Sequence, residues 1–137
     1  ELFKIDPRIE ILSNPAPLLV PLIENNGEPW LYDILETYLR PLQTQNIDGL
    51  ILGCTHYSYV KDMAEQILGP NIPVLSQTDI IPDKLERYLT KHPEISDKIP
   101  RESAHKFYLT DITDTYLNTS ERIYGKEISF EKAQYQT

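Results

Sequence analysis

The segment LILGCTHYSYVKD (residues 50–62) contains the only cysteine of the chain, Cys54, with His56 two positions later. A cysteine acts as a base or a nucleophile in its thiolate form, and a neighbouring imidazole favours that form. In an extended segment, side chains two positions apart point to the same side, so we expect Cys54 and His56 to lie within reach of each other. The pair predicts proton-transfer or nucleophilic chemistry. From these residues alone, a buried structural cysteine beside a packing histidine stays open as the alternative.

The residues around Cys54 predict a strand, a turn and a helix. The run LIL (50–52) is short and continuously apolar, which is typical of a parallel strand buried on both faces. Gly53 then opens a turn, and Thr55 and Ser58 are available to cap the helix that should follow. The free N–H groups and the positive dipole end of that helix would favour a thiolate and attract a substrate carboxylate.

Strands and helices alternate along the rest of the chain. Apolar spacing predicts a helix from Pro29, whose stripe of Leu and Ile side chains continues to a kink or an end near Pro41. The other expected elements are strands at 9–13, 73–75, 107–111 and around 128–130, a short helix within 15–27, and helices at about 60–68, 80–91 and 114–124, with a polar loop before 105. This order predicts an α/β fold with a largely parallel, Rossmann-like sheet. Ligands bind such sheets at the carboxyl ends of the strands, where Cys54 is expected.

Composition excludes several classes of partner. A formal net charge of −8 argues against nucleic acid, which needs clustered Lys and Arg. Neither a basic amphipathic face nor a run of roughly 18 apolar residues is present, so no membrane association is expected. One cysteine excludes an internal disulfide and fits a reducing, cytoplasmic location. Cys/His zinc spacings are also missing, so we expect no metal site.

LILGCTHY resembles the C-terminal cysteine motif of the aspartate/glutamate racemase family, and specifically that of the glutamate racemases within it. The segment PLLVPLIE, which ends at Glu24 thirty positions before Cys54, is similar to a family segment that ends in a glutamate. VLSQTD and FYLTD, each followed by a predicted helix, resemble the closing pattern of the family. Other racemases of the superfamily often carry an acidic residue where His56 stands, so the histidine favours glutamate over aspartate. The resemblance covers nearly the whole chain.

The resemblance implies racemisation of glutamate by two cysteines without pyridoxal, metal or any other cofactor. One thiolate removes the Cα proton and the other thiol protonates the opposite face. On the matched positions, Cys54 is one of the pair and His56 assists it. Thr55 would hold the substrate carboxylate, and Glu24 would neighbour the bound substrate, against the alternative of a solvated charge at a helix end. In bacteria, the D-glutamate formed supplies peptidoglycan.

The resemblance also implies that part of the site is missing. The first half of family members carries the other cysteine, and this sequence has no cysteine besides Cys54. We therefore expect a C-terminal fragment that is inactive alone. Residues 1–75 would be most of the second α/β domain, and residues 76–137 would return to the first. The full-length protein is expected to form a homo-oligomer, a dimer. Two alternatives stay open: a Cys/His hydrolase, and a non-catalytic α/β module that binds carboxylates.

Overall fold

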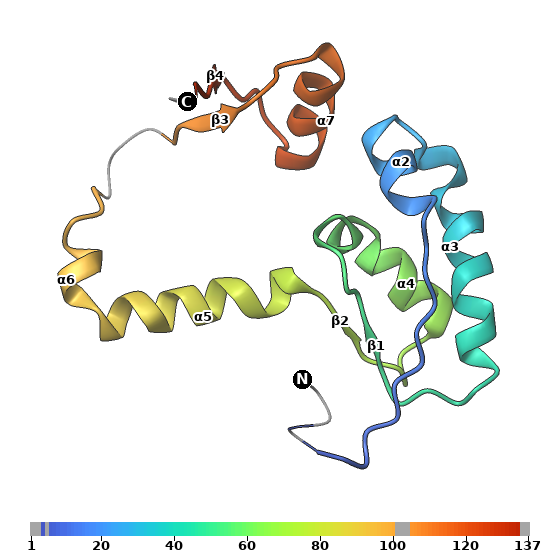
Figure 1. The fold of residues 1–137 in the computed structure, drawn as a ribbon. Helices are drawn as coiled ribbons and strands as arrows, with labels where there is room; N and C mark the ends of the chain where they lie inside the picture. Colours follow the sequence, from blue (N-terminus) through green and yellow to red (C-terminus); the bar gives the residue numbers. More distant parts are fainter. Residues whose placement is uncertain (1–3, 5, 101–104, 135–137) are drawn as a thin grey trace.

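The computed structural model describes residues 4, 6–100 and 105–134 (Figure 1). The described strands form two parallel pairs, β1 with β2 and β3 with β4, so the predicted α/β class is confirmed, with two small sheets in place of one. The elements in chain order are α2 (Leu19–Glu24), α3 (Glu28–Gln43), β1 (Leu50–Ile51), the 3₁₀ helix η1 (Thr55–Val60), α4 (Lys61–Leu68), β2 (Val74–Leu75), α5 (Gln77–Lys91), α6 (Pro93–Ser96), β3 (Phe107–Leu109), α7 (Asp114–Tyr124) and β4 (Phe130–Lys132).

The core lies between α2, α3, η1 and α4. Helix α3 buries one leucine per turn, at Leu31, Leu35, Leu39 and Leu42, because residues three or four apart share a helix face. This stripe belongs to one buried cluster with Ile23 of α2 and other apolar side chains of η1 and α4. The predicted helix is therefore confirmed, although it runs past Pro41 to Gln43.

The chain turns sharply between α2 and α3. Asn26 has a φ of 57°, and the N–H of Gly27 donates to the Leu22 carbonyl at 2.7 Å. A Cβ on Gly27 would lie 2.8 Å from the Leu22 Cα, closer than any side chain can come. Only glycine fits there, and α3 can therefore fold back directly onto α2.

The β1–β2 pair packs one face on the core. Leu52 and Val74 are buried, whereas the paired Ile51 and Leu75 are 60% and 45% exposed. The prediction of a strand buried on both faces is therefore wrong for the described part of the chain, because only the face toward the α4 side is covered.

Two other predicted elements differ from the structure. Residues 9–13 are irregular, with Ile11 and Leu12 nearly half exposed, because no described strand pairs with this apolar run. The predicted loop after residue 91 contains the short helix α6. Helix α5 begins at Gln77, earlier than predicted, because the Ser76 side chain and the Asp79 carboxylate cap its first turn reciprocally.

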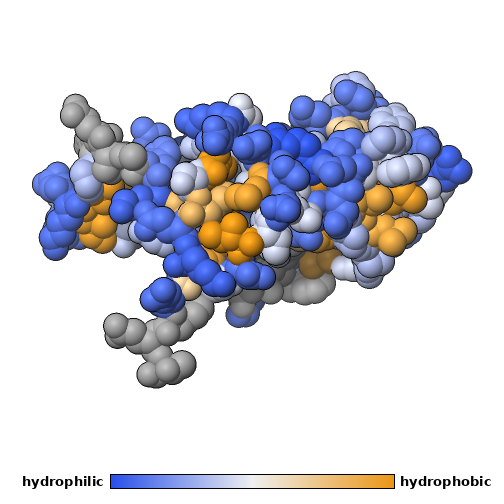
Figure 2. Space-filling model, turned by 90° about the horizontal axis from the view of Figure 1, so that it is seen from above, coloured by the Kyte–Doolittle hydropathy of each residue, from blue (hydrophilic) through white to orange (hydrophobic). Residues whose placement is uncertain are grey.

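Helix α5 extends away from the core, and the chain then turns back, so that α7 approaches α2 (Figure 1). No residue of α5 is buried, and Ile81 and Leu85 are both more than half exposed. Seen from above, several groups of hydrophobic residues reach the surface (Figure 2). Within the described ranges, no helix combines the length and apolar character required to cross a membrane.

Candidate active site

Cys54 lies just beyond the carboxyl end of β1, where the α/β architecture predicts a site. The last ladder bond runs from the Leu52 N–H to the Leu75 carbonyl at 2.9 Å. Cys54 keeps extended backbone angles, φ −125° and ψ 144°, and η1 begins at the next residue. Cys54 is neither buried nor fully exposed, so part of the residue is open to solvent.

The helix that follows Cys54 differs from the prediction. It is a six-residue 3₁₀ helix, and the α-helix α4 begins only at Lys61. Cys54 itself occupies the N-cap position, with no side-chain capping bond, so the expected caps from Thr55 and Ser58 are wrong. Because dipole effects fade within the first turn, α4 contributes little at Cys54, and the nearby imidazole is the main partner of the thiol.

Cys54, His56 and Glu24 form a continuous chain of polar contacts. Cys54 Sγ lies 3.9 Å from His56 Nδ1, and His56 Nε2 lies 2.9 Å from Glu24 Oε1. The His56 and Glu24 side chains are 35% and 38% exposed, so the chain of contacts lies at an accessible surface. The predicted proximity of Cys54 and His56 is present, and Glu24 joins them from 32 positions away.

The direction of these contacts gives the imidazole a defined role. An ionised carboxylate only accepts hydrogen bonds. Nε2 of His56 therefore carries a proton and donates a hydrogen bond to Glu24. In neutral His56, Nδ1 is then the bare nitrogen, and it faces the Cys54 thiol. Proton transfer from Sγ to Nδ1 would leave a thiolate beside an imidazolium that Glu24 stabilises. The arrangement can therefore generate a reactive thiolate.

Tyr57 also stabilises the turn that carries Cys54 and His56. No pattern in the sequence predicted this role. The Tyr57 hydroxyl donates to the Ala16 carbonyl at 3.0 Å, which ties η1 to the turn that precedes α2. Burial raises the pKa of Tyr57, and negative charge at Cys54 and at Tyr38 raises it further. The phenol thus stays protonated and keeps donating. Its position in the motif, next to His56, was the only signal available.

The other predicted residue, Thr55, is exposed at the first position of η1 beside Cys54. A cavity of about 500 Å³ is lined by Glu24 and His56, but not by Cys54, together with residues of β3, α7 and β4. The aromatic side chains of its lining include Phe107, Tyr116 and Phe130. Among the residues that the structure describes, no three His, Cys, Asp or Glu side chains are placed so that they could hold a metal ion together.

Comparison with curated proteins identifies relatives of this chain, although no protein-family model matches it. A glutamate racemase of Syntrophus aciditrophicus is 32% identical over 131 residues, which covers 91% of this chain and 47% of that protein. A glutamate racemase of Phenylobacterium zucineum is 33% identical over 138 residues, covering 95% and 48%. The chain matches the C-terminal half of glutamate racemases. The resemblance predicted from the sequence is thereby confirmed.

Solved structures agree with these glutamate racemase relatives. The glutamate racemase of Francisella tularensis, solved in complex with D-glutamate, has a TM-score of 0.81 at 26% identity. A glutamate racemase isoform of Bacillus anthracis has a TM-score of 0.78 at 25% identity. Each comparison covers 97% of this chain and 50% of the other. The chain therefore spans about half the length of the racemases it matches.

Proposed function

We propose that this chain supplies one half of a glutamate racemase active site, with Cys54 as one of two proton carriers. The observation that carries the proposal is the chain of contacts from Cys54 through His56 to Glu24, at a strand end, in a sequence matched to glutamate racemases. The substrate would be L- or D-glutamate, and the reaction an inversion at Cα. In a bacterium, the D-glutamate formed would supply peptidoglycan synthesis in the cytoplasm.

The proposed reaction has two steps, and each step moves one proton. The Cys54 thiolate removes the Cα proton, so the C–H bond breaks, an S–H bond forms and the electron pair stays on a planar Cα. A second thiol on the opposite face then gives its proton to Cα and becomes a thiolate. Nothing is oxidised or reduced, and the roles reverse for the other enantiomer. Since Cys54 is the only cysteine of this sequence, the second thiol must come from the other half.

His56, Glu24 and Thr55 would support Cys54 in different ways. His56 accepts the thiol proton before Cys54 acts as a base, and Glu24 holds the imidazole in the orientation that this transfer requires. Because it is linked to Cys54 through His56, Glu24 would also neighbour the bound amino acid. Thr55, exposed beside Cys54, would hold the substrate carboxylate through its N–H and hydroxyl.

The domain division is proposed to fall after β2, so that residues 1–75 belong to one α/β domain and residues 76–137 return to the other. Two observations support this division. The sheet β3–β4 is separate from β1–β2, and the connecting helix α5 has no buried residue. The remaining half of the racemase would cover Ile51, Leu75 and the apolar side of α5.

A Cys/His hydrolase is the second candidate, and one observation favours it. Such an enzyme needs a third group that orients the histidine, and Glu24 occupies that position here. A rapid burst of p-nitrophenol from p-nitrophenyl acetate, followed by slow turnover at Cys54, would support this function over racemisation.

The decisive experiment measures racemisation with and without the other half. The 137-residue chain alone should not change the optical rotation of L-glutamate, because one thiol cannot serve both faces, and any deuterium it introduces at Cα from D₂O should be in L-glutamate only. Mixed with the separately expressed remaining half of a related glutamate racemase, it should lower the optical rotation and form D-glutamate that carries deuterium at Cα. Cys54→Ser should abolish this gain, because a hydroxyl is a far poorer base than a thiolate. Racemisation by the chain alone would contradict the two-cysteine mechanism.

A further inference from the structure

The C-terminal end of α2 lies at the site and needs partners for its last four carbonyl groups. Two of them are satisfied locally. The N–H of Asn25 donates to the Pro21 carbonyl at 3.1 Å, and the N–H of Gly27 donates to the Leu22 carbonyl at 2.7 Å. The carbonyls of the last two residues receive no backbone donor from this turn.

Helix α7 supplies the two missing donors from the far end of the chain. The Thr119 hydroxyl donates to the Glu24 carbonyl at 2.8 Å, across 95 positions of sequence. The Arg122 guanidinium donates to the Ile23 carbonyl, across 99 positions. Thr119 is 9% exposed, one of two buried polar residues in the described part of the chain. Because a buried carbonyl without a partner is costly, these two bonds matter for the end of α2.

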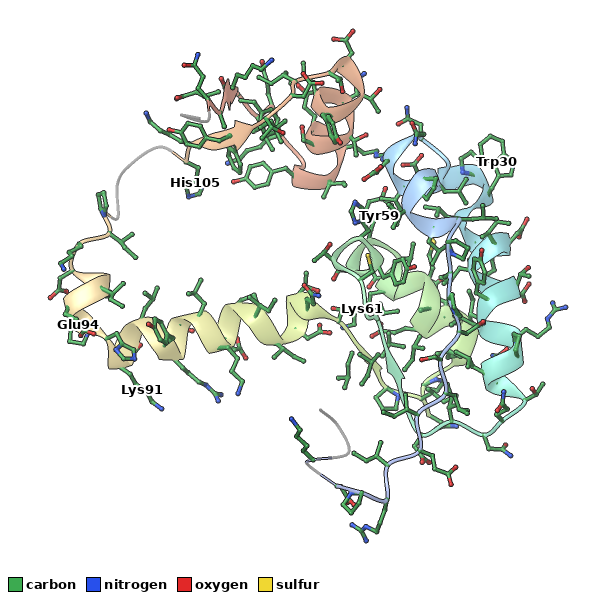
Figure 3. All side chains as sticks on the ribbon, viewed as in Figure 1. Trp30, Tyr59, Lys61, Lys91, Glu94 and His105 are labelled. Atoms are coloured by element: carbon green, nitrogen blue, oxygen red, sulfur yellow. The ribbon has the colours of Figure 1, made fainter. Side chains whose placement is uncertain are left out.

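Arg122 makes further contacts around the same turn. It donates to the side-chain oxygen of Asn26 at 2.8 Å, pairs with the Glu28 carboxylate, and lies 5.8 Å from the centre of the Tyr59 ring. Figure 3 places Tyr59 on the side of η1 that faces α7 and α2. A positive charge at the carboxyl end of a helix is also electrostatically favourable. Thus α7 contacts residues on both sides of the turn that follows Glu24.

We propose that Thr119 and Arg122 are positioning residues, which hold the end of α2 so that the Glu24 carboxylate meets His56 Nε2. The carbonyl that Thr119 contacts and the carboxylate that orients His56 belong to one residue. A six-residue helix has little stability of its own and frays readily when its end loses partners. Movement of α7 would therefore reach Cys54 through Glu24 and His56. The catalytic meaning of this link rests on the proposed function.

The test uses Cys54 alkylation by iodoacetamide at neutral pH on the folded chain, where a single thiol makes the rate unambiguous. Wild type, Thr119→Val, Glu24→Gln and the double variant form a double-mutant cycle. Thr119→Val removes the donor at similar volume and should slow alkylation about threefold to tenfold. Thr119→Ser keeps the hydroxyl and should restore the wild-type rate. Asn118→Ala, an exposed neighbour on α7, is the control and should leave the rate unchanged.

The cycle separates positioning from a merely structural role. If Thr119 acts through Glu24, the double variant should alkylate at the rate of Glu24→Gln alone. Additive effects, or a Thr119→Val rate equal to wild type, would overturn the proposal. Should Thr119→Val fail to fold, Arg122→Lys replaces it in the cycle with the same expected outcomes, since lysine lacks the two separate nitrogens with which the guanidinium contacts the Ile23 carbonyl and Asn26. Alkylation of Cys54 requires no turnover. The alkylation rates can therefore be interpreted even if the chain proves not to take part in glutamate racemisation.

Discussion

Helices α3 and α5 are nearly equal in length, 16 and 15 residues, and both carry an apolar stripe, yet they have opposite environments. Helix α3 buries four leucines against α2 and α4, whereas α5 buries none of its residues. Leu35 is 2% exposed and Leu85 is 54% exposed. An amphipathic pattern therefore indicates that one face of a helix should pack against another apolar surface. It does not show that this surface belongs to the same chain.

The comparison also separates the site from its surroundings. Glu24 and the turn carrying Cys54 and His56 rest on the packed unit formed by α2, α3, η1 and α4. The α5 face and the outer face of β1–β2 stay exposed beside it. The chain thus contains a packed support for the proposed catalytic thiol and an exposed apolar surface on which the proposed remaining half would pack.

The largest expected effect contrasts one leucine from each helix. Leu35→Ala should lower the free energy of unfolding by about 2–5 kcal/mol, because it leaves a cavity in a packed core. Leu85→Ala, the matched control on α5, should change it by less than about 0.5 kcal/mol. Urea denaturation followed by circular dichroism measures both. Equal losses would mean that α5 is packed in solution, and the contrast between the helices would be lost.

A second prediction is that Cys54 reactivity depends on His56 and not on α5. His56→Asn should slow alkylation of Cys54 about tenfold, the usual effect of one close charge on an ionisation. Leu85→Ala should leave the rate unchanged. The measurement is the rate of iodoacetamide labelling by mass spectrometry, with a chelator present throughout. An unaltered rate in His56→Asn would leave the histidine as a packing residue.

The next prediction, of smaller expected effect, is that the chain self-associates through α5. Exposed Ile81, Leu85 and Tyr88 form an apolar surface of the kind that mediates contact between protein chains. Sedimentation velocity of the chain should show concentration-dependent dimers or larger species. Leu85→Lys should weaken this association several-fold, whereas Lys84→Glu, an exposed charge reversal beside it, should not. A compact monomer at every concentration would argue against the domain division proposed after β2.

The helices and their ends were predictable because their signals are local. The stripe of Leu31, Leu35 and Leu39 and the punctuation by Gly27 lie within one segment of sequence. The error at residues 9–13 has a different origin, since a strand exists only when another strand pairs with it, and an apolar run does not encode its partner. The exposure of Ile51 was missed for the same reason.

The candidate site divides in the same way. Cys54 and His56 are two positions apart, so their contact followed from spacing. The bond between His56 and Glu24 spans 32 positions, and only the family resemblance indicated that Glu24 lies near the site. Thr119 and Arg122 gave no signal at all, because a threonine and an arginine inside an amphipathic helix are ordinary. Their role depends on how α7 folds back onto α2, which no local pattern encodes.

The smallest predicted effect concerns the ion pair that links the packed unit to α5. Lys61 lies at the start of α4 (Figure 3). Its Nζ is 2.7 Å from Oδ1 of Asp79, which lies in the first turn of α5. The hydrogen bond from Lys61, followed by those from the N–H and hydroxyl of Ser76, lowers the pKa of Asp79 from 3.8 to about 2. Asp79 should therefore stabilise the fold fully above about pH 5, where the unfolded carboxyl, with its ordinary pKa of 3.8, is almost completely ionised. That contribution is lost as the pH falls through about 2.

Melting temperatures between pH 5 and pH 2 test this link. Wild type should lose more stability over this range than Asp79→Asn, which has no carboxyl to protonate. Asp83→Asn, an exposed acidic position on the same helix, should follow the wild-type curve. The difference should be small, because the Lys61 and Asp79 side chains are 24% and 33% exposed and water weakens their attraction. Parallel curves for wild type and Asp79→Asn would show that the Asp79 carboxylate stabilises the fold neither through Lys61 nor through its bonds to Ser76.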